Sequence, residues 1–454
     1  MDDSPSIDPL DSSGSASDQL GPPTRRIRRR RFTLVSAVVA LALIGGGVAV
    51  TVADSTASAG ASNPSAAVNN LLMTVDRGDL LGALGAIVPG ERNAIEPGLI
   101  GLVDQLKRLG VLSPATNLND LSGLSLHFSG VQMKTTMLTP VLAAVTITAG
   151  RVSSSVTPTQ LPLGPFARGL AASSLAHNST STTSSASTGS SAIVAENVGG
   201  SWYVSLGYTI AVDALRAKGG SGAPPPTSEA VQPTGSGTPQ GAVRALLDDG
   251  AALDLPGLIG EFPPGEMGAL QSYAPLFIGP AETRLEKSQA KVKLTITSVN
   301  FSELPISGGE LVRVTDLGIS ARIGRIVIGI KGGCVTETAG QSTIRRCSAR
   351  SASANSSQRL IAILPPSLRS LALRLINGRP AIGFVTTNEN GRWFVSPMAT
   401  VLDGLDAYAA NLEPQDLMAI ENLVHNRSEL NALAHSFAEL ELGSLTSARA
   451  ASNA

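Results

Sequence analysis

One stretch of the chain occurs twice, and this repeat limits the folds that the chain can adopt. The first copy spans residues 79–91 and the second spans residues 254–266. The alignment extends without a gap over residues 64–94 and 239–269. Self-similarity in a fixed frame is the signature of a duplicated structural unit, so we expect two related domains. The positions with identical residues, in first-copy numbering, are Pro64, Ala67, Val68, Leu71, Leu72, Asp79, Leu80, Gly82, Gly85, Pro89, Gly90, Glu91 and Ala94.

The N-terminal part of the chain predicts a membrane anchor. Residues 1–31 are rich in Ser, Pro, Gly and Asp, which favours disorder, and they end in a cluster of arginines. Residues 32–53 carry no charge and are long enough for a helix to cross roughly 30 Å of hydrocarbon. Because positive charge stays cytoplasmic, we expect residues 54–454 outside. An uncleaved anchor is favoured because the apolar run is long; cleavage near residues 57–59 is the alternative.

Composition and the repeat together divide the chain into segments. Gly-, Ser- and Pro-rich stretches separate the two repeats from each other and from the anchor, as expected for linkers. The predicted segments are a disordered cytoplasmic tail (1–31), a transmembrane helix (32–53), a linker (54–63), a first α+β repeat (64–216), a linker (217–238), a second α+β repeat (239–408), and a C-terminal helix and tail (409–454).

Within each repeat the apolar pattern predicts helices first and strands afterwards. Val68, Leu71 and Leu72 lie at helical spacing, whereas later segments alternate apolar and polar residues. Helices followed by an antiparallel sheet indicate an α+β fold. Helices are expected near 64–75, 80–87, 91–110, 240–253, 255–261 and 266–277, strands at 124–134, 141–147, 292–301, 310–322 and 323–331, closing hairpins at 192–205 and 381–396, and a mobile Ser/Thr loop at 171–192.

Four repeated carboxylates attract attention as chemical groups, but their positions indicate a structural role. Asp79 and Asp254 stand directly before short helices, where a carboxylate caps free backbone N–H groups. Glu91 and Glu266 follow Pro-Gly turns, where the first turn of a helix favours negative charge. We interpret all four as devices that start helices.

The two tryptophans and the two cysteines are predicted to be structural residues. Trp202 and Trp393 lie in the closing hairpins, where a core anchor is favoured over a ligand platform. Cys334 and Cys347 lie in the second repeat, on a segment expected outside the cytoplasm, so a disulfide is favoured. A redox or metal pair is the alternative, but no His or Cys cluster accompanies them.

A helix over 412–442 is expected to bind the core or a partner.

The chain contains no recognisable motif for catalysis or for a cofactor. Its net charge of −1 gives no general attraction to nucleic acid. There is no phosphate-binding loop, dinucleotide fingerprint or nucleophile elbow. Metal-ligand spacing is absent from the histidines as well. We therefore predict no catalytic, cofactor-binding or metal-binding residue. The four histidines are His127, His177, His425 and His435.

The repeated unit resembles the nuclear-transport-factor-2-like (NTF2-like), cystatin-related α+β cone. The resemblance rests on a start of the form A-V-x-x-L-L, a following Asp-Leu, and a closing G-x-W-[YF]-V-S, which here contains Trp202 and Trp393. The whole layout resembles a group of actinobacterial single-pass membrane proteins, some of which are labelled flagellar basal body-associated. Cone folds curl a sheet around a pocket. The resemblance therefore implies a non-enzymatic extracytoplasmic module that binds an envelope protein or a small apolar ligand. A flagellar-type membrane protein, an enzyme of this fold and a structural spacer are the alternatives.

Overall fold

The computed structural model describes most of the chain between residues 60 and 426. The described ranges are 60–175, 180–185, 192–289, 292–323, 325–331, 334–347 and 383–426, with single residues at 364, 369, 371, 428 and 431. The predicted tail and the apolar segment 32–53 lie outside these ranges. No helix in the described part of the chain is long and apolar enough to cross a membrane.

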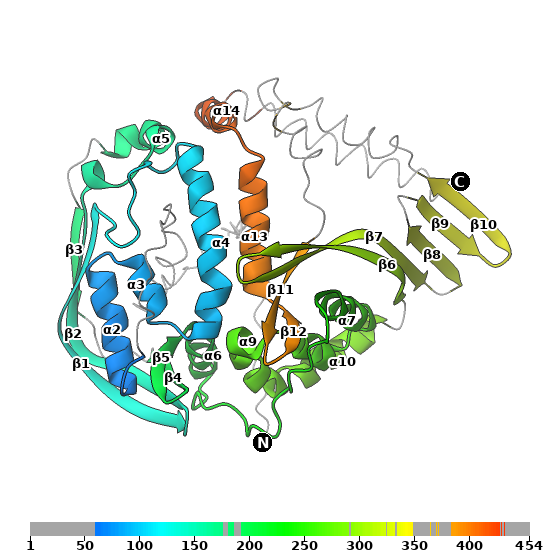
Figure 1. Ribbon diagram of the computed structural model, residues 1–454, viewed down its shortest axis with the longest axis horizontal. Coiled ribbons are helices and arrows are strands. Elements are labelled where there is room, and N and C mark those ends of the chain that lie inside the picture. The colour runs from blue at the N-terminus through cyan, green and yellow to red at the C-terminus, as the bar shows by residue number, and fades with distance from the viewer. Residues whose placement is uncertain are drawn as a thin grey trace, which may run out of the picture.

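Residues 60–216, which we call the N-terminal half, begin with helices and continue with a sheet (Figure 1). A final helix follows the last strand. The elements are α2 (Pro64–Asp76), α3 (Leu80–Gly85), α4 (Pro89–Arg108), β1 (Leu124–Thr139), β2 (Leu142–Val156), η1 (Pro158–Gln160), α5 (Pro165–Leu175), β3 (Thr180–Ser185), β4 (Ala192–Val198), β5 (Ser201–Ser205) and α6 (Leu206–Arg216).

Residues 236–410, which we call the C-terminal half, follow the same order and add strands of their own. The elements are α7 (Pro239–Ala252), α8 (Leu255–Gly260), α9 (Pro264–Tyr273), η2 (Ala274–Leu276), α10 (Ile278–Gln289), β6 (Val292–Ile306), β7 (Gly309–Ile323), β8 (Ile326–Lys331), β9 (Cys334–Ala339), β10 (Ser342–Cys347), β11 (Gly383–Glu389), β12 (Arg392–Val395) and α13 (Pro397–Ala410). A further helix, α14 (Pro414–His425), follows this half.

The predicted helix starts are confirmed. Pro64 occupies the first turn of α2, and proline is favoured there because its missing N–H is not needed. The side chain of Asp79 accepts a hydrogen bond from the N–H of Gly82 at 2.7 Å. Asp254 does the same for Gly257 at 3.0 Å. Both aspartates therefore cap short helices, as their positions before α3 and α8 predict.

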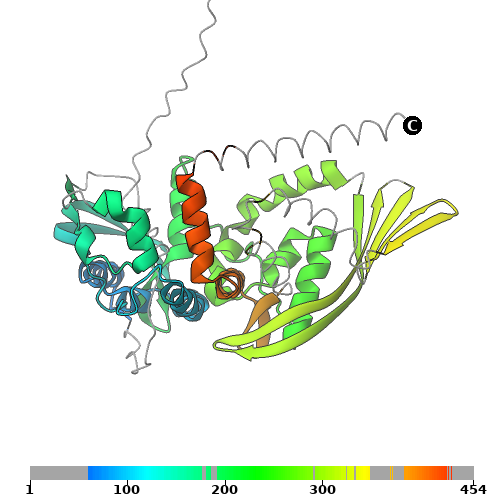
Figure 2. The same cartoon turned by 90° about the horizontal axis from the view of Figure 1, so that it is seen from above.

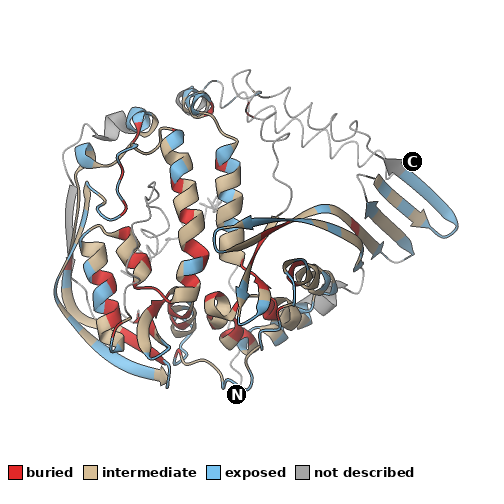
Figure 3. Cartoon of the chain, viewed as in Figure 1, coloured by how far each residue is buried: buried red, intermediate tan, exposed pale blue. Residues whose placement is uncertain are grey.

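Each half has an antiparallel sheet whose concave side faces a helix. In the N-terminal half the strand order is β1-β2-β4-β5, with β3 beside β2, and the sheet curves around α2 (Figure 1). In the C-terminal half the order is β10-β9-β8-β7-β11-β12, with β6 beside β7. The chain is therefore an α+β protein with two antiparallel sheets packed with helices. Buried residues, red in Figure 3, gather where helices face these sheets.

Apolar side chains fill the space between each sheet and its helices. In the N-terminal half the buried cluster is Val68, Leu71, Leu72, Ala83, Ala86, Val145, Ile193 and Val204. In the C-terminal half, Ala242, Val243, Val312 and Val395 are buried, and Leu246, Leu247, Phe301, Phe384 and Trp393 pack against them. Apolar burial of this kind is the main driving force that holds helix and sheet together.

In each half, the residues just before the first helix pair with the last strand of the sheet. Ala61 and Trp202 exchange two backbone hydrogen bonds of 2.9 and 2.8 Å. Ser236 and Trp393 exchange two of 2.8 Å. Both tryptophan side chains are half-buried and pack against the edge of a core cluster. The fully buried residues of these closing strands lie further along, at Val204 and Val395.

The segment between the halves has no regular structure, yet it is held at several points. The N–H of Thr234 donates to the carbonyl of Gly260 at 2.8 Å. The hydroxyl of Tyr273 donates to the carbonyl of Gly222 at 2.7 Å. Arg392 donates to the carbonyl of Gly235 at 2.7 Å. Residues 217–238, which are rich in Gly and Pro, therefore lie against the C-terminal half.

The structure differs from the sequence prediction in residues 171–192. A mobile loop is expected there, but α5 continues to Leu175 and β3 pairs with β2 from Thr180 to Ser185. Threonine is compatible with strands, and an open edge of β2 supplies the hydrogen-bonding partner. Helices α6 and α13 and the β9–β10 hairpin are further elements that the apolar pattern alone does not predict.

The cysteines begin and end the β9–β10 hairpin. The register places Cys334 directly opposite Cys347. Opposed residues in antiparallel strands have α-carbons about 4.5–5.5 Å apart, which lies within the range that a disulfide requires. The side chain of Cys347 lies outside the described part, so the disulfide remains a prediction.

Candidate functional site

The two halves join through four helices that occupy equivalent places in the repeat. Helix α4 of the N-terminal half packs against α13 of the C-terminal half, while α9 packs against α6 and α4 (Figure 1). Gly90 and Gly265 touch at the crossing of α4 and α9. A β-carbon on Gly90 would lie 2.2 Å from the carbonyl of Gly265. The duplicated Pro-Gly-Glu sequence therefore forms the α4–α9 contact between the halves.

The glutamates of this sequence connect the start of each half with its closing helix. Glu91 accepts hydrogen bonds from the Ser205 hydroxyl at 2.7 Å and from the N–H groups of Leu206 and Gly207 at 2.7 and 2.9 Å. A carboxylate at a helix N-terminus satisfies free N–H groups and the helix dipole. Glu91 therefore lies in the first turn of α4, as predicted, and also caps α6.

Glu266 repeats this arrangement in the C-terminal half. It accepts hydrogen bonds from the Ser396 hydroxyl at 2.5 Å and from the N–H of Met398 at 2.7 Å. Burial raises the pKa of Glu266 to about 7, against the lowering effect of these bonds. Burial likewise raises the pKa of Glu91 and, with the charge of Glu91, the pKa of Glu196 to about 7. The hydrogen bonds of Glu91 and Glu266 are better explained by a structural role, since each carboxylate connects two helices of its half.

On one side of the junction, between α6 and α9, aromatic side chains fill the space. The rings of Tyr208 and Tyr273 meet edge to face, with centroids 6.1 Å apart. The Tyr208 hydroxyl lies 2.8 Å from the Ser272 hydroxyl. Val212 is fully buried in the same cluster, and Leu215 packs against it. This side of the junction is a closed apolar core.

On the other side, between α4 and α13, the equivalent positions are small or acidic. Counting from the paired serines Ser205 and Ser396, the residues Tyr208, Val212 and Leu215 correspond to Ala399, Asp403 and Asp406. Counting from the paired glutamates, Tyr273 corresponds to Gly98. The substitutions remove two rings and introduce two carboxylates at one place in the fold.

A cleft of about 150 Å³ lies at this place. Its lining comes from α4, α13, β11 and the β6–β7 turn, so both halves contribute to it. The helices approach closely because α4 has glycines at the contact; a β-carbon on Gly98 would lie 2.5 Å from the β-carbon of Leu402. The lining residues are Asn93, Ala94, Pro97, Gly98, Gly101, Ile306, Ser307, Gly308, Val385, Thr387, Ala399, Asp403 and Asp406.

The two aspartates give the cleft a negative charge. Burial raises the pKa of Asp403, Asp406 raises it further, and Arg313 lowers it. Burial also raises the pKa of Asp406, against a hydrogen bond from Gln105. Ion pairs in the described part of the chain include His127–Asp76 and Arg244–Asp248, and neither involves a cleft aspartate.

The nearest basic side chain of α4 has other partners. Arg108 donates to the carbonyls of Ala409 and Leu412 at 2.8 and 3.0 Å. Ala409 lies in the last turn of α13 and Leu412 just beyond it, where a cation is favoured by the helix dipole. Arg108 therefore holds α13 against α4, and its charge acts on Asp406 only through space, where it lowers the pKa that burial raises.

Two polar atoms of the lining residues are buried without a hydrogen-bond partner in the described part of the chain. They are Oγ1 of Thr387 and Oδ1 of Asp406. A buried polar atom without a partner costs about 1–3 kcal/mol. Such a cost within a cleft indicates a place where a bound donor improves the energy of the protein.

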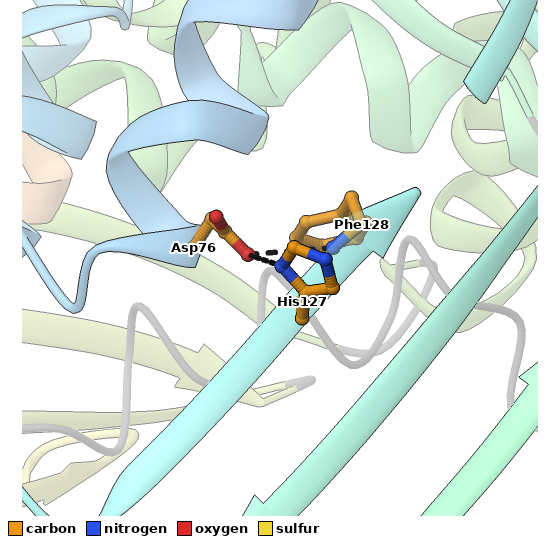
Figure 4. A network of polar contacts seen from close by, with 3 residues as sticks. All are labelled: Asp76, His127 and Phe128. Carbon is orange, nitrogen blue, oxygen red and sulfur yellow. Dashed lines mark hydrogen bonds and ion pairs between the residues drawn. The ribbon is translucent and has the colours of Figure 1, made fainter. Parts of the chain in front are cut away.

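The histidines do not form a site. Nδ1 of His127 lies 3.0 Å from Oδ1 of Asp76, which also accepts from the N–H of Phe128 at 3.3 Å (Figure 4). The His127 side chain is 64% exposed, so this pair fastens β1 to the end of α2 at the surface. His177, His435 and the side chain of His425 lie outside the described part. No group of three or more His, Cys, Asp or Glu residues in that part is arranged to hold a metal ion.

None of the carboxylates, tryptophans, histidines or cysteines that the sequence singles out is among the lining residues of the cleft, although Ala94 of the repeated positions is. Trp202, Trp393 and Cys334 are absent from its lining, and Glu91 and Glu266 lie at the crossing of the helices. The cleft residues carry no motif that identifies them separately. A comparison of the two copies beyond the closing serines reveals the signal, because Val212 and Leu215 become Asp403 and Asp406.

Comparison of the chain with protein-family models, with curated proteins and with solved structures finds no match in any of the three. The candidate site therefore rests on its geometry.

Proposed function

We propose that this protein is a membrane-anchored, extracytoplasmic binding protein whose ligand enters the cleft between its two halves. One observation carries the proposal. The tyrosine-filled contact at Tyr208 and Tyr273 is replaced, at the equivalent place, by a cleft that contains Asp403 and Asp406. Loss of apolar packing is unfavourable by itself, and a pair of half-buried carboxylates adds to the cost. A bound ligand offsets both.

The ligand that suits this cleft is a small organic cation, such as a primary ammonium or guanidinium group on a flexible chain. Its charge compensates Asp403 and Asp406, and its N–H groups reach the oxygens of Asp406 and Thr387. The volume of about 150 Å³ is below the 300–1,000 Å³ of sites for drug-sized ligands. A calcium ion would need six to eight oxygen ligands, and the described carboxylates do not gather in that number.

The resemblance to NTF2-like cones also supports a binding function, but it implies a different place for the ligand. Two α+β units with helices first and a closing hairpin are in keeping with NTF2-like, cystatin-like cones. In such cones an apolar ligand lies inside the curved sheet. Here the apolar clusters around Val68 and Val243 occupy the helix–sheet space. We therefore place the ligand between the cones, without a catalytic role for any residue.

The ligand class has a direct test with two amino-acid amides and a neutral control. In calorimetric titration of the full chain, N-acetyl-lysinamide or N-acetyl-argininamide is expected to bind at least tenfold more tightly than N-acetyl-norleucinamide. Asp403→Asn with Asp406→Asn should weaken cation binding by about tenfold to a hundredfold, because a charge-assisted hydrogen bond contributes roughly 1.5–3 kcal/mol.

The matched control is Asp248→Asn, since Asp248 pairs with Arg244 on the surface of α7. It should leave cation binding unchanged. Equal binding of the neutral amide, or equal loss in the control variant, would exclude a cation site in the cleft.

The extracytoplasmic location is tested separately. The arginine cluster before residues 32–53 predicts that everything after the anchor is outside. A reporter enzyme that is active only outside the cytoplasm, fused after Ala454, should be active. A second reporter that is active only in the cytoplasm should stay silent at the same position, and activity of that reporter would reverse the topology.

A further inference from the structure

The C-terminal sheet extends beyond the body of the protein as an arm. The arm consists of β8, β9 and β10 together with the parts of β6 and β7 that pair with them, residues 292–296 and 319–323. Figures 1 and 2 show β8–β10 projecting away from the helices that join the two halves. We call these strands the β-arm.

The register of the β-arm separates apolar from polar side chains. Opposed residues in an antiparallel sheet share a face. One row across the strands is Leu294, Ala321, Ile328, Glu337 and Ile344. The neighbouring rows on this face contain Ile319, Ile330, Val335 and Arg346, and Ile323, Ile326, Ala339 and Ser342. The opposite face contains Ser320, Arg322, Val327, Gly329, Lys331, Thr336, Thr338, Thr343 and Arg345.

The apolar face is the more exposed one. Six of its large side chains have exposed fractions between 38 and 48%, while Ile319 and Ile328 are half-buried. The β9 residues Val335, Glu337 and Ala339 are exposed, whereas Thr336 and Thr338 on the other face are half-buried. Figure 3 shows much of the arm as exposed. A contiguous exposed apolar surface in a folded protein marks a site of interaction. The large exposed residues of this face are Leu294, Ile323, Ile326, Ile330, Val335 and Ile344.

The fold itself does not require this apolar face. In the N-terminal half the strand in the place of β8 is β3, which pairs with β2 as β8 pairs with β7. Its sequence consists only of serine and threonine, whereas β8 reads Ile-Val-Ile-Gly-Ile-Lys. Strands β9 and β10 have no counterpart among the described strands of the N-terminal half. The apolar arm is therefore a feature of the second copy alone.

The charge of the β-arm indicates what covers it. Residues 319–347 contain five cationic residues and one acidic residue, a net charge of +4 (5 − 1), in a chain whose net charge is −1. Two copies placed face to face would bring like charges together. An anionic lipid surface attracts basic residues and accepts apolar side chains at its headgroup boundary. The register places Arg346 on the apolar face, and Arg325 lies directly before β8, whereas the opposite face carries Arg322, Lys331 and Arg345. The cations of the opposite face still add to the attraction, which acts over a Debye length of about 8–10 Å. The charged residues are Arg322, Arg325, Lys331, Arg345, Arg346 and Glu337.

We infer that the β-arm is a second membrane contact, which lies flat on an anionic lipid surface with its Ile/Val/Leu face toward the acyl chains. Glu337 in the middle row keeps the face at headgroup depth, since a carboxylate in the hydrocarbon core is costly. The open edge of β10 likewise stays among the headgroups, where water satisfies its backbone groups. One weak lipid contact becomes firm when the chain has a second anchor.

The inference is tested with paired tryptophan variants of the full chain in vesicles. Ile344 and Thr343 are neighbours on β10 that point to opposite faces, and both are exposed. Ile344→Trp should gain a blue-shifted emission that lipids with brominated acyl chains quench. Thr343→Trp should not be quenched. The parent chain supplies the background from its own tryptophans, and co-flotation of each variant with vesicles shows that the variants are equally membrane-bound.

Lipid charge provides the second measurement. Quenching of the Ile344→Trp variant should be at least twofold stronger in vesicles containing about 30% phosphatidylglycerol than in pure phosphatidylcholine, and high salt should reduce the difference. Absence of quenching, or equal quenching at positions 343 and 344, overturns the inference. A blue shift without quenching that grows with protein density would assign the face to a second copy. The same shift independent of protein density would assign it to another segment of this chain.

Discussion

Replacement of Gly90 by alanine is expected to destabilise the protein by about 3 kcal/mol, at the upper end of the cost of overpacking. The added β-carbon would lie 2.2 Å from both the carbonyl carbon and the carbonyl oxygen of Gly265. Neither atom belongs to a flexible side chain, so α4 and α9 must move apart. The change separates the halves at the point where they cross, while each sheet keeps its own core.

Chemical denaturation measures the loss of stability, and trypsin cleavage at the exposed Lys218 between the halves should become faster. Two controls define the effect. Gly265→Ala should cost less, because its β-carbon would meet the end of the Glu389 side chain at 2.9 Å. Gly404→Ala on α13 meets no atom within 4 Å and should stabilise the helix by roughly 0.5–1 kcal/mol. Equal stability of the Gly90 and Gly404 variants would refute the proposed contact between the halves.

The second large effect is a loss of stability as the pH rises. Burial raises the pKa of Glu266 to about 7 from an ordinary value of 4.5. The proton is therefore held more tightly in the folded protein than in the unfolded chain. The resulting stabilisation is complete below about pH 4.5 and is lost as the pH rises through 7. At 1.36 kcal/mol per pKa unit, the loss is about 3 kcal/mol.

Glu266→Gln isolates this contribution. Glutamine keeps an acceptor for the N–H of Met398 and does not titrate, so the fall in unfolding free energy between pH 5 and 8 should be markedly smaller than in the parent. Part of the fall should remain, because the pKa of Glu196 is also raised to about 7. Glu229→Gln, at an exposed position, should leave the pH dependence of the unfolding free energy unchanged. A parent that is more stable at pH 8 than at pH 5 would contradict the prediction.

The local elements of the fold could be predicted because their signals lie within a few residues. Asp79 and Asp254 stand directly before their helices, and the Gly turns of the closing hairpins stand between apolar strands. Helices α6 and α13 also have a local signal in the sequence, since Ser205 and Ser396 cap them by accepting hydrogen bonds from N–H groups three residues further on. The strand at Thr180–Ser185 has no local signal, because it forms by pairing with β2, which the tertiary fold brings beside it.

The cleft could not be predicted from either repeat alone. Gly98 reads as an ordinary helical glycine, and Asp403 and Asp406 read as solvated charges on a helix. They form a cleft only because α4 of one half packs against α13 of the other. This contact joins residues that lie some 300 positions apart in the chain, such as Arg108 and Ala409. The repeat offers an indirect signal, since Tyr273 stands where Gly98 stands in the first copy.

The paired backbone contacts at Ala61–Trp202 and Ser236–Trp393 have a mechanical consequence. Each consists of two hydrogen bonds, isolated from the longer ladders of the sheets. Tension applied to the N-terminal side of residue 60 reaches the Ala61–Trp202 pair before it reaches α2 or the strands of the core. This pair can release a few residues of slack while the N-terminal half stays folded.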